Sequence, residues 1–214
     1  MPTRSSLFAP LLVVGSLLLS ACGGSAPPPN MPQYAPGTVQ YRLPVVGAWR
    51  VYRTHYGANN DQAYALDLVI DDKMPRSQRN EDHPSYNQPI VADAPGVVVV
   101  AVDGVPDNVP GRVNKYDMHG NFVVIDHQNG EYSLFAHLIP GTVRVRKGMF
   151  VPAGTELGRC GNSGHSFAPH LHWQVMTDAD ATAARGVPPK YVPYERNGAM
   201  SVDLPQKNDR LLAK

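Results

Sequence analysis

Residues 121–138 read NFVVIDHQNGEYSLFAHL, and this stretch predicts the architecture of the chain. Two apolar, β-rich runs flank Asn129-Gly130, and an Asn-Gly pair in that setting is the strongest short-range signal for a β-hairpin. No segment shows sustained helical periodicity, so we expect an all-β domain built as a compact antiparallel sheet or sandwich. Other short apolar runs, separated by turn residues, cover 39–46, 49–55, 64–70, 90–102, 142–145, 150–151, 155–160 and 171–176.

Composition narrows the classes of protein that this chain can be. Its 214 residues suffice for one ordinary domain with modest extras, and 43% hydrophobic residues can fill a core. Nineteen basic against eighteen acidic side chains leave no basic field for nucleic acid, so we expect no nucleic-acid partner. Two cysteines cannot form a disulfide framework. The sequence indicates no oligomeric state.

Residues 1–21 have the pattern of a secretory signal. Arg4 precedes an apolar run over 7–19, which is shorter than the roughly 20 residues of a membrane-spanning helix. The run leads to Leu-Ser-Ala-Cys22, which resembles a bacterial lipobox. That resemblance implies cleavage before Cys22, a lipid (palmitate) anchor on it, and an outer-membrane position facing the periplasm, because Gly23 follows. The alternative is an ordinary signal peptide with a coincidental cysteine.

The remaining chain divides into three parts. Residues 22–38 are rich in Pro, Gly and Ser and predict an extended tether. Residues 39–177 hold the folded domain, and 178–214 are expected to form a C-terminal surface arm. Two polar connections, 71–87 and 104–120, are longer than ordinary hairpin loops, so we expect them to wall a site.

Two histidines and a carboxylate stand out in the strands. In the run PHLHW, His170 and His172 are two residues apart, so on a strand they share a face about 6.6 Å apart. This spacing suits one metal ligand with the other imidazole beside it. Asp67 lies in the apolar run YALDLVI, where an unpaired carboxylate is costly. His55 ends the preceding strand, and a hairpin would bring it close to Asp67. A structural salt bridge is the alternative role for Asp67.

Two imidazoles and one carboxylate, with water in the fourth position, are typical of a catalytic Zn²⁺ site. His137 ends the strand YSLFAHL just before the turn Pro140-Gly141, from where it can reach a neighbouring cleft. These residues form a candidate constellation of three ligands and two further imidazoles.

Together these motifs resemble the M23 metallopeptidases, the LytM/lysostaphin-like peptidoglycan endopeptidases. Five patterns of the family occur in this chain. They are G-N-x-V-x-I-x-H at 120–127, Y/F-A-H-L at 135–138, K-G-x-x-V-x-x-G-x-x-x-G at 147–158, G-x-S/T-G at 161–164 and P-H-L-H-F/W at 169–173. The resemblance implies that His55, Asp67 and His172 bind Zn²⁺ and that His137 and His170 are catalytic. In many members the first two ligands occur in the pattern H-x-x-x-D, whereas Asp67 here comes twelve residues after His55. His83 is therefore an alternative first ligand.

The family resemblance implies a zinc endopeptidase that cuts peptide cross-links of peptidoglycan through a metal-activated water. One alternative is a catalytically silent module that binds the wall or activates another hydrolase. Another is a lipoyl-type carrier, because the strand rhythm of 147–158 also fits such hairpins. The carrier interpretation leaves Asp67 and the histidines unexplained.

Overall fold

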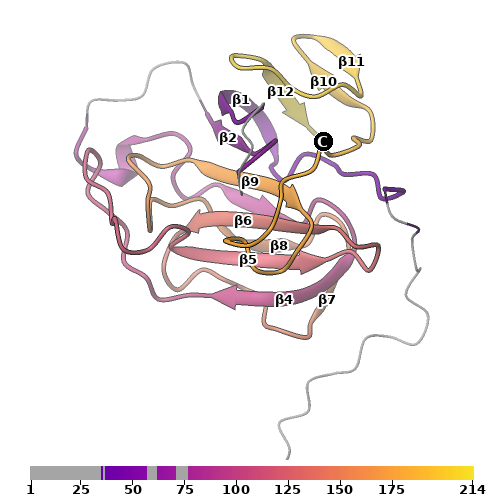
Figure 1. Cartoon of the computed structure of the whole chain (residues 1–214). Helices are drawn as coiled ribbons and strands as arrows, with labels where there is room; N and C mark the ends of the chain where they lie inside the picture. The colour runs from indigo at the N-terminus through magenta and orange to yellow at the C-terminus, as the bar shows by residue number, and fades with distance from the viewer. Residues whose placement is uncertain (1–34, 36, 57–61, 71–76) are drawn as a thin grey trace, which may run out of the picture.

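The hairpin predicted at residues 121–138 is present in the computed structural model, which describes residues 35, 37–56, 62–70 and 77–214. The described residues form strands and a single short 3₁₀ helix, so the all-β prediction is confirmed (Figure 1). The elements are β1 (Gly47–Thr54), β2 (Leu66–Val69), η1 (Asn80–Asp82), β3 (Pro89–Val91), β4 (Gly96–Val102), β5 (Asn121–Asp126), β6 (Tyr132–Leu138), β7 (Phe150–Val151), β8 (Glu156–Arg159), β9 (Leu171–Met176), β10 (Tyr194–Arg196), β11 (Ala199–Ser201) and β12 (Arg210–Ala213).

One large sheet organises the described residues. Its ten strands run in the order β11-β10-β12-β1-β2-β9-β6-β5-β4-β7, and every named pair is antiparallel. β3 and β8 form a second, two-stranded sheet. Within the described ranges no helix has the length and hydropathy needed to cross a membrane.

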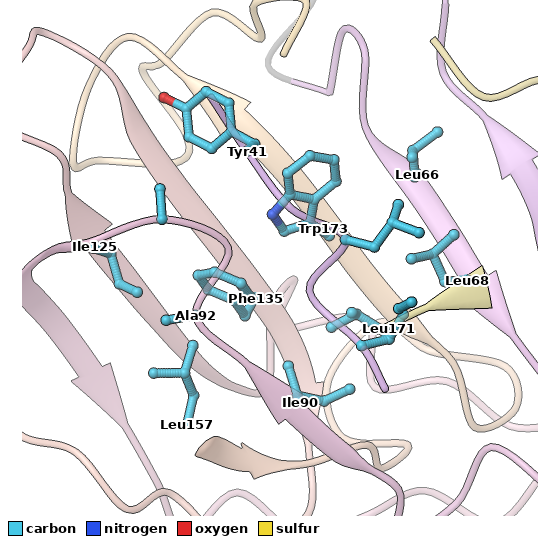
Figure 2. Close-up of a cluster of buried hydrophobic side chains, with 14 of the residues drawn as sticks. Tyr41, Leu66, Leu68, Ile90, Ala92, Ile125, Phe135, Leu157, Leu171 and Trp173 are labelled. Atoms are coloured by element: carbon cyan, nitrogen blue, oxygen red, sulfur yellow. The ribbon is translucent and has the colours of Figure 1, made fainter. Parts of the chain in front are cut away.

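The main core cluster covers one face of the large sheet, and a smaller buried cluster includes the alternate residues Leu134 and Ala136 of β6. Leu66 and Leu68 of β2, Phe135 of β6, and Leu171 and Trp173 of β9 are fully buried in one cluster (Figure 2). Residues of the two-stranded sheet, such as Ile90 and Leu157, belong to the same cluster (Figure 2). Because side chains alternate along a strand, the residues between these apolar ones face away from the core. This alternation decides which residues of β2 and β9 can build a site.

Two predicted strands are not formed. Residues 39–46 make only isolated bridges, Tyr41 with Tyr191 and Val45 with Ile90, although Val39, Tyr41, Leu43 and Val45 are buried. Pro44, which is buried as well, lacks a backbone N–H and cannot donate to a ladder, which explains why this apolar run forms no strand. Residues 142–145 are likewise outside any strand.

The C-terminal segment is part of the sheet rather than a surface arm. β12 pairs with β1, β10 pairs with β12, and Tyr194, Leu211 and Ala213 join the main core. The predicted signal peptide, Cys22 and nearly all of the tether, up to residue 34 and again at 36, lie outside the described residues.

Candidate functional site

β2 and β9 hold the first two site residues on the face opposite the core. Asp67 lies directly across from His172 in the antiparallel register, and the apolar neighbours of both point inward. Asp67 Oδ1 accepts a hydrogen bond from His172 Nδ1 at 2.9 Å. Both residues are buried, with 6% and 7% exposure. Strand alternation therefore produces a buried polar pair from two otherwise apolar strands.

His55 completes a group of three at the end of β1. Its backbone N–H donates to Ala65 O at 3.0 Å, which closes the β1–β2 pairing, and its Nε2 donates to Asp67 Oδ2 at 3.2 Å. Three potential ligand atoms, one each from His55, Asp67 and His172, lie within 4.8 Å of one another. This arrangement is that of a possible metal site. His83 is buried elsewhere, with Nε2 3.3 Å from Ser77 O. Within the described residues, the geometry thus brings together the three predicted ligands and leaves His83 apart.

The two histidines determine the charge of Asp67. Burial raises the pKa of this carboxyl, but hydrogen bonds from His172 and His55, together with the electrostatic effect of His170 and His172, outweigh burial, and the pKa lies well below its ordinary value of 3.8. Asp67 is therefore ionised throughout the neutral range. An ionised carboxylate between two imidazoles is the state that a cation requires of its ligands.

A β-bulge turns His137 into the same site. Between the pairs Val123–Phe135 and Asn121–Leu138, β5 has one residue whereas β6 has two, Ala136 and His137. His137 has φ +67°, a left-handed conformation that is uncommon outside glycine and is enriched near functional sites. Strict alternation would place His137 on the core face with Phe135. The bulge instead brings its ring to 4.7 Å from the His170 ring and 5.9 Å from the His172 ring, centroid to centroid.

Backbone carbonyls determine the tautomers of both flanking histidines. His137 Nδ1 donates to Ser163 O at 2.8 Å, and His170 Nδ1 donates to Ala168 O at 2.9 Å. A carbonyl oxygen can only accept, so Nδ1 carries the proton in each ring and Nε2 keeps its lone pair. His170 Nε2 lies 3.8 Å from Asp67 Oδ1, beside the three-residue group. Both rings thus offer a proton acceptor to the site.

Burial keeps both rings neutral. It lowers the pKa of His137 well below 6.5, and the nearby His170 and His172 lower it further. Burial also lowers the pKa of His170, an effect that Asp67 and the Ala168 carbonyl partly oppose. At neutral pH an uncharged imidazole is the form that can accept a proton.

All five residues line one cavity of about 300 Å³. The connection 104–120 contributes Val113, Met118 and His119, so it walls the site as predicted, whereas the described part of 71–87 contributes none of the lining. Several further side chains line the cavity without a motif that marks them in the sequence: Tyr52, Arg53, Gln62, Val69, His119, His165 and Phe167. A strict period of two along β1 would not place the adjacent residues Tyr52 and Arg53 at the same cavity. Both reach it because β1 has a bulge at this point, between Val51 and Arg53.

The turn Gly161-Asn162-Ser163-Gly164 holds the carbonyl that orients His137. Ser163 Oγ donates to Leu138 O at 2.7 Å and accepts from Asn121 N at 3.0 Å, which ties the turn to the hairpin. Gly164 has φ +73°, and a Cβ there would stand 2.3 Å from Gly120 N. Glycine is therefore required at 164 both for its backbone conformation and for the close approach of Gly120.

Parts of this chain are similar to known proteins. Residues 83–184 match the model of peptidase family M23. The folded domain that contains this segment is called the M23 domain below, after the family model that the segment matches. The matched segment contains His137, His170 and His172, whereas His55 and Asp67 precede it.

Two curated relatives of the M23 domain come from Vibrio cholerae. Peptidoglycan DD-endopeptidase ShyA is 27% identical over 135 residues, which are 63% of this chain and 26% of ShyA. Peptidoglycan DD-endopeptidase ShyB is 33% identical over 64 residues, 30% of this chain and 15% of ShyB. The chain therefore spans about a quarter or less of the length of these relatives.

Solved structures give a similar picture for the M23 domain. A variant of the catalytic domain of the prophage-encoded M23 protein EnpA from Enterococcus faecalis is 20% identical, with a TM-score of 0.45, covering 72% of this chain and 92% of that one. The catalytic domain of lysostaphin from Staphylococcus simulans is 22% identical, with a TM-score of 0.40, covering 64% and 84%.

The donor set of the M23 domain fits a metal ion. Two imidazole nitrogens and one carboxylate oxygen are three of the four ligands typical of a catalytic zinc site. His55 Nε2 and His172 Nδ1 donate to Asp67 in this arrangement, so binding a metal ion through these atoms would require each ring to carry its proton on its other nitrogen. Of the five predicted residues, none lies away from the cavity.

Proposed function

We propose that the M23 domain is a zinc-dependent endopeptidase that hydrolyses peptide cross-links of bacterial peptidoglycan. The observation that carries the proposal is the His55–Asp67–His172 group beside two neutral imidazoles in one cavity. The family match and two relatives named as peptidoglycan DD-endopeptidases support the choice of substrate.

His55, Asp67 and His172 would hold the ion. When bound, a zinc ion supplies Lewis acidity, which polarises a peptide carbonyl and makes water nucleophilic near neutral pH. The buried carboxylate remains ionised and balances part of the added charge. Its neighbours Leu66 and Leu68 are anchored in the core, which limits movement of the ligand.

His137 and His170 would move protons. Each ring has a free Nε2, because its Nδ1 proton is held by a backbone carbonyl. One ring accepts the proton of the attacking water, and the protonated imidazole then donates to the leaving amine. The rings lie 4.7 Å apart between centroids, close enough for both to contact one tetrahedral centre. Positive charge on either ring also stabilises the developing oxyanion.

Removal of metal tests this proposal directly. The full chain is incubated with purified peptidoglycan before and after treatment with a chelator, and released muropeptides are analysed by mass spectrometry. We expect peptide-bond cleavage without chelator, loss of cleavage with it, and recovery when Zn²⁺ is restored, because the three-ligand group has no substitute among the described residues. Cleavage that survives complete metal removal would contradict the proposal. Binding to peptidoglycan without cleavage would favour the silent module instead.

We also propose that Cys22 carries a lipid anchor that places the domain at the outer membrane facing the periplasm. The lipobox-like run before Cys22 and the Pro-rich tether after it support this assignment. We expect Cys22→Ser to abolish incorporation of labelled palmitate and to release the protein from the membrane fraction. Equal labelling of Cys22→Ser and the parent chain would contradict the anchor.

A further inference from the structure

A β-bulge at the end of β1 aims an arginine into the cavity. Val51 pairs with Leu68 and Arg53 pairs with Asp67, so Tyr52 is an extra residue in β1. Residues directly opposite in an antiparallel pair share a face, which puts Arg53 on the face of Asp67 and His172. Tyr52 and Arg53, although adjacent in the chain, both line the cavity. Bulges often redirect a side chain in this way beside active sites.

Arg53 is the one lysine or arginine among the described residues that line this cavity, and Asp67 is the one carboxylate. Both oxygens of Asp67 already accept hydrogen bonds, Oδ2 from His55 and Oδ1 from His172. In the part of the chain that the structure describes, no ion pair is formed by Arg53. Among the described residues its guanidinium therefore has no ion-pair partner, and the oxygens of Asp67, which lies opposite Arg53 in the register, are taken up by the two histidines.

The charge of the cavity adds to this argument. Arg53 and Asp67 cancel formally, so a bound divalent ion would leave the cavity with a net charge of about +2. A ligand that carries a negative charge beside its reacting bond would be attracted to this position.

We propose that Arg53 binds a carboxylate of the substrate peptide next to the scissile bond and selects substrates in which that carboxylate is free. The inference rests on the proposed endopeptidase function and specifies its substrate class. A guanidinium can bind a carboxylate through two parallel hydrogen bonds, which gives geometric selectivity as well as attraction. Because Arg53 shares the cavity with the three-ligand group, the carboxylate belongs within one or two residues of the cleaved bond, at about 3.3 Å per extended residue.

The test compares two cross-linked peptide dimers that differ only in whether the carboxylates beside the cross-link are free or amidated. The full chain, loaded with Zn²⁺, is assayed as the parent, Arg53→Gln and Arg53→Lys. Arg146→Gln is the matched control, because Arg146 is exposed in the segment before β7, at the far end of the large sheet. Metal content is measured for each variant, since Arg53 is two residues from His55.

For the parent chain we expect a higher kcat/KM on the free dimer than on the amidated one. Arg53→Gln should lower kcat/KM on the free dimer by about fivefold to tenfold, chiefly through KM, and leave the amidated dimer unchanged. Arg53→Lys should keep part of the preference, and Arg146→Gln all of it. An equal loss on both dimers, or an unchanged preference in Arg53→Gln, would overturn the inference.

A second measurement separates this inference from the proposed function. If the parent chain cleaves neither dimer, the endopeptidase proposal fails, and binding of the same dimers is measured by isothermal titration. A preference for the free dimer that Arg53→Gln removes supports the role of Arg53 independently of catalysis. Equal binding of both dimers by the parent chain overturns it.

Discussion

Asp67→Asn is expected to reduce metal affinity by more than about 100-fold and to abolish measurable hydrolysis. The substitution keeps the size of the side chain but removes the negative charge and one of the two acceptors that hold His55 and His172. A neutral amide between two imidazoles cannot offset the charge of a divalent ion. The readouts are bound metal per chain after dialysis and cleavage of peptidoglycan.

Asp178→Asn is the matched control for this prediction. Asp178 is exposed in the turn after β9 and accepts a local hydrogen bond from Asp180 N. It should bind metal and hydrolyse peptidoglycan as the parent chain does. Thermal unfolding of the metal-free proteins shows whether Asp67→Asn is folded. A folded Asp67→Asn that retains stoichiometric metal would reject this carboxylate as a ligand.

The same assay decides between His55 and His83 as first ligand. His55→Ala should lose metal because His55 Nε2 is one of the three clustered ligand atoms. His83→Asn should retain it, because His83 bonds to Ser77 O instead. Retained metal in His55→Ala would reject the assignment.

His137→Asn is expected to retain the metal ion and lose about 10²- to 10⁴-fold in kcat, the range of general acid–base catalysis. Asparagine is chosen because it tolerates the left-handed backbone that His137 adopts at φ +67°, so the bulge is not strained further. The Asn side chain has no basic nitrogen to accept a proton from water. His170→Ala should behave in the same way, because its ring lies beside the same group.

The measurements are bound metal and single-turnover cleavage of a defined peptide. His83→Asn serves as the control substitution, since it exchanges the same residue types outside the cavity. It should keep nearly full activity. A kcat near that of the parent chain in both His137→Asn and His170→Ala would contradict the proposed proton transfer. Loss of bound metal in either variant would indicate that the substituted histidine is a metal ligand.

Sequence reasoning located much of this site because local patterns carry the relevant information. Alternation in the runs around Asp67 and His172 predicts one apolar face and one polar residue aimed away from it, and the structure has both. The hairpin between β5 and β6 follows from Asn129-Gly130. The strand predicted at residues 39–46 is not formed, because Pro44 cannot donate a hydrogen bond to a neighbouring strand.

Other features depended on contacts between distant segments. The sequence predicts a surface arm for the C-terminal segment, because residues 194–213 carry little apolar pattern of their own. In the structure, pairing with β1 through β12 holds this segment in the sheet. Arg53 and Tyr52 were not assigned to the site, because the extra residue in β1 is visible only against its partner β2. A bulge is defined by two strands, so a single strand does not reveal it.

By itself, the sequence marked the candidate side chains of the site: a carboxylate and histidines set in strands that otherwise form a core. Periodicity of two is a local property of an extended chain, and it assigns each residue to a face. The tertiary structure alone decided how those side chains meet. Asp67 and His172, 105 residues apart, become neighbours through strand register, and His137 turns towards them because its bulge and the Ser163 carbonyl hold it there. Register and bulges arise from long-range backbone pairing, which no local pattern encodes.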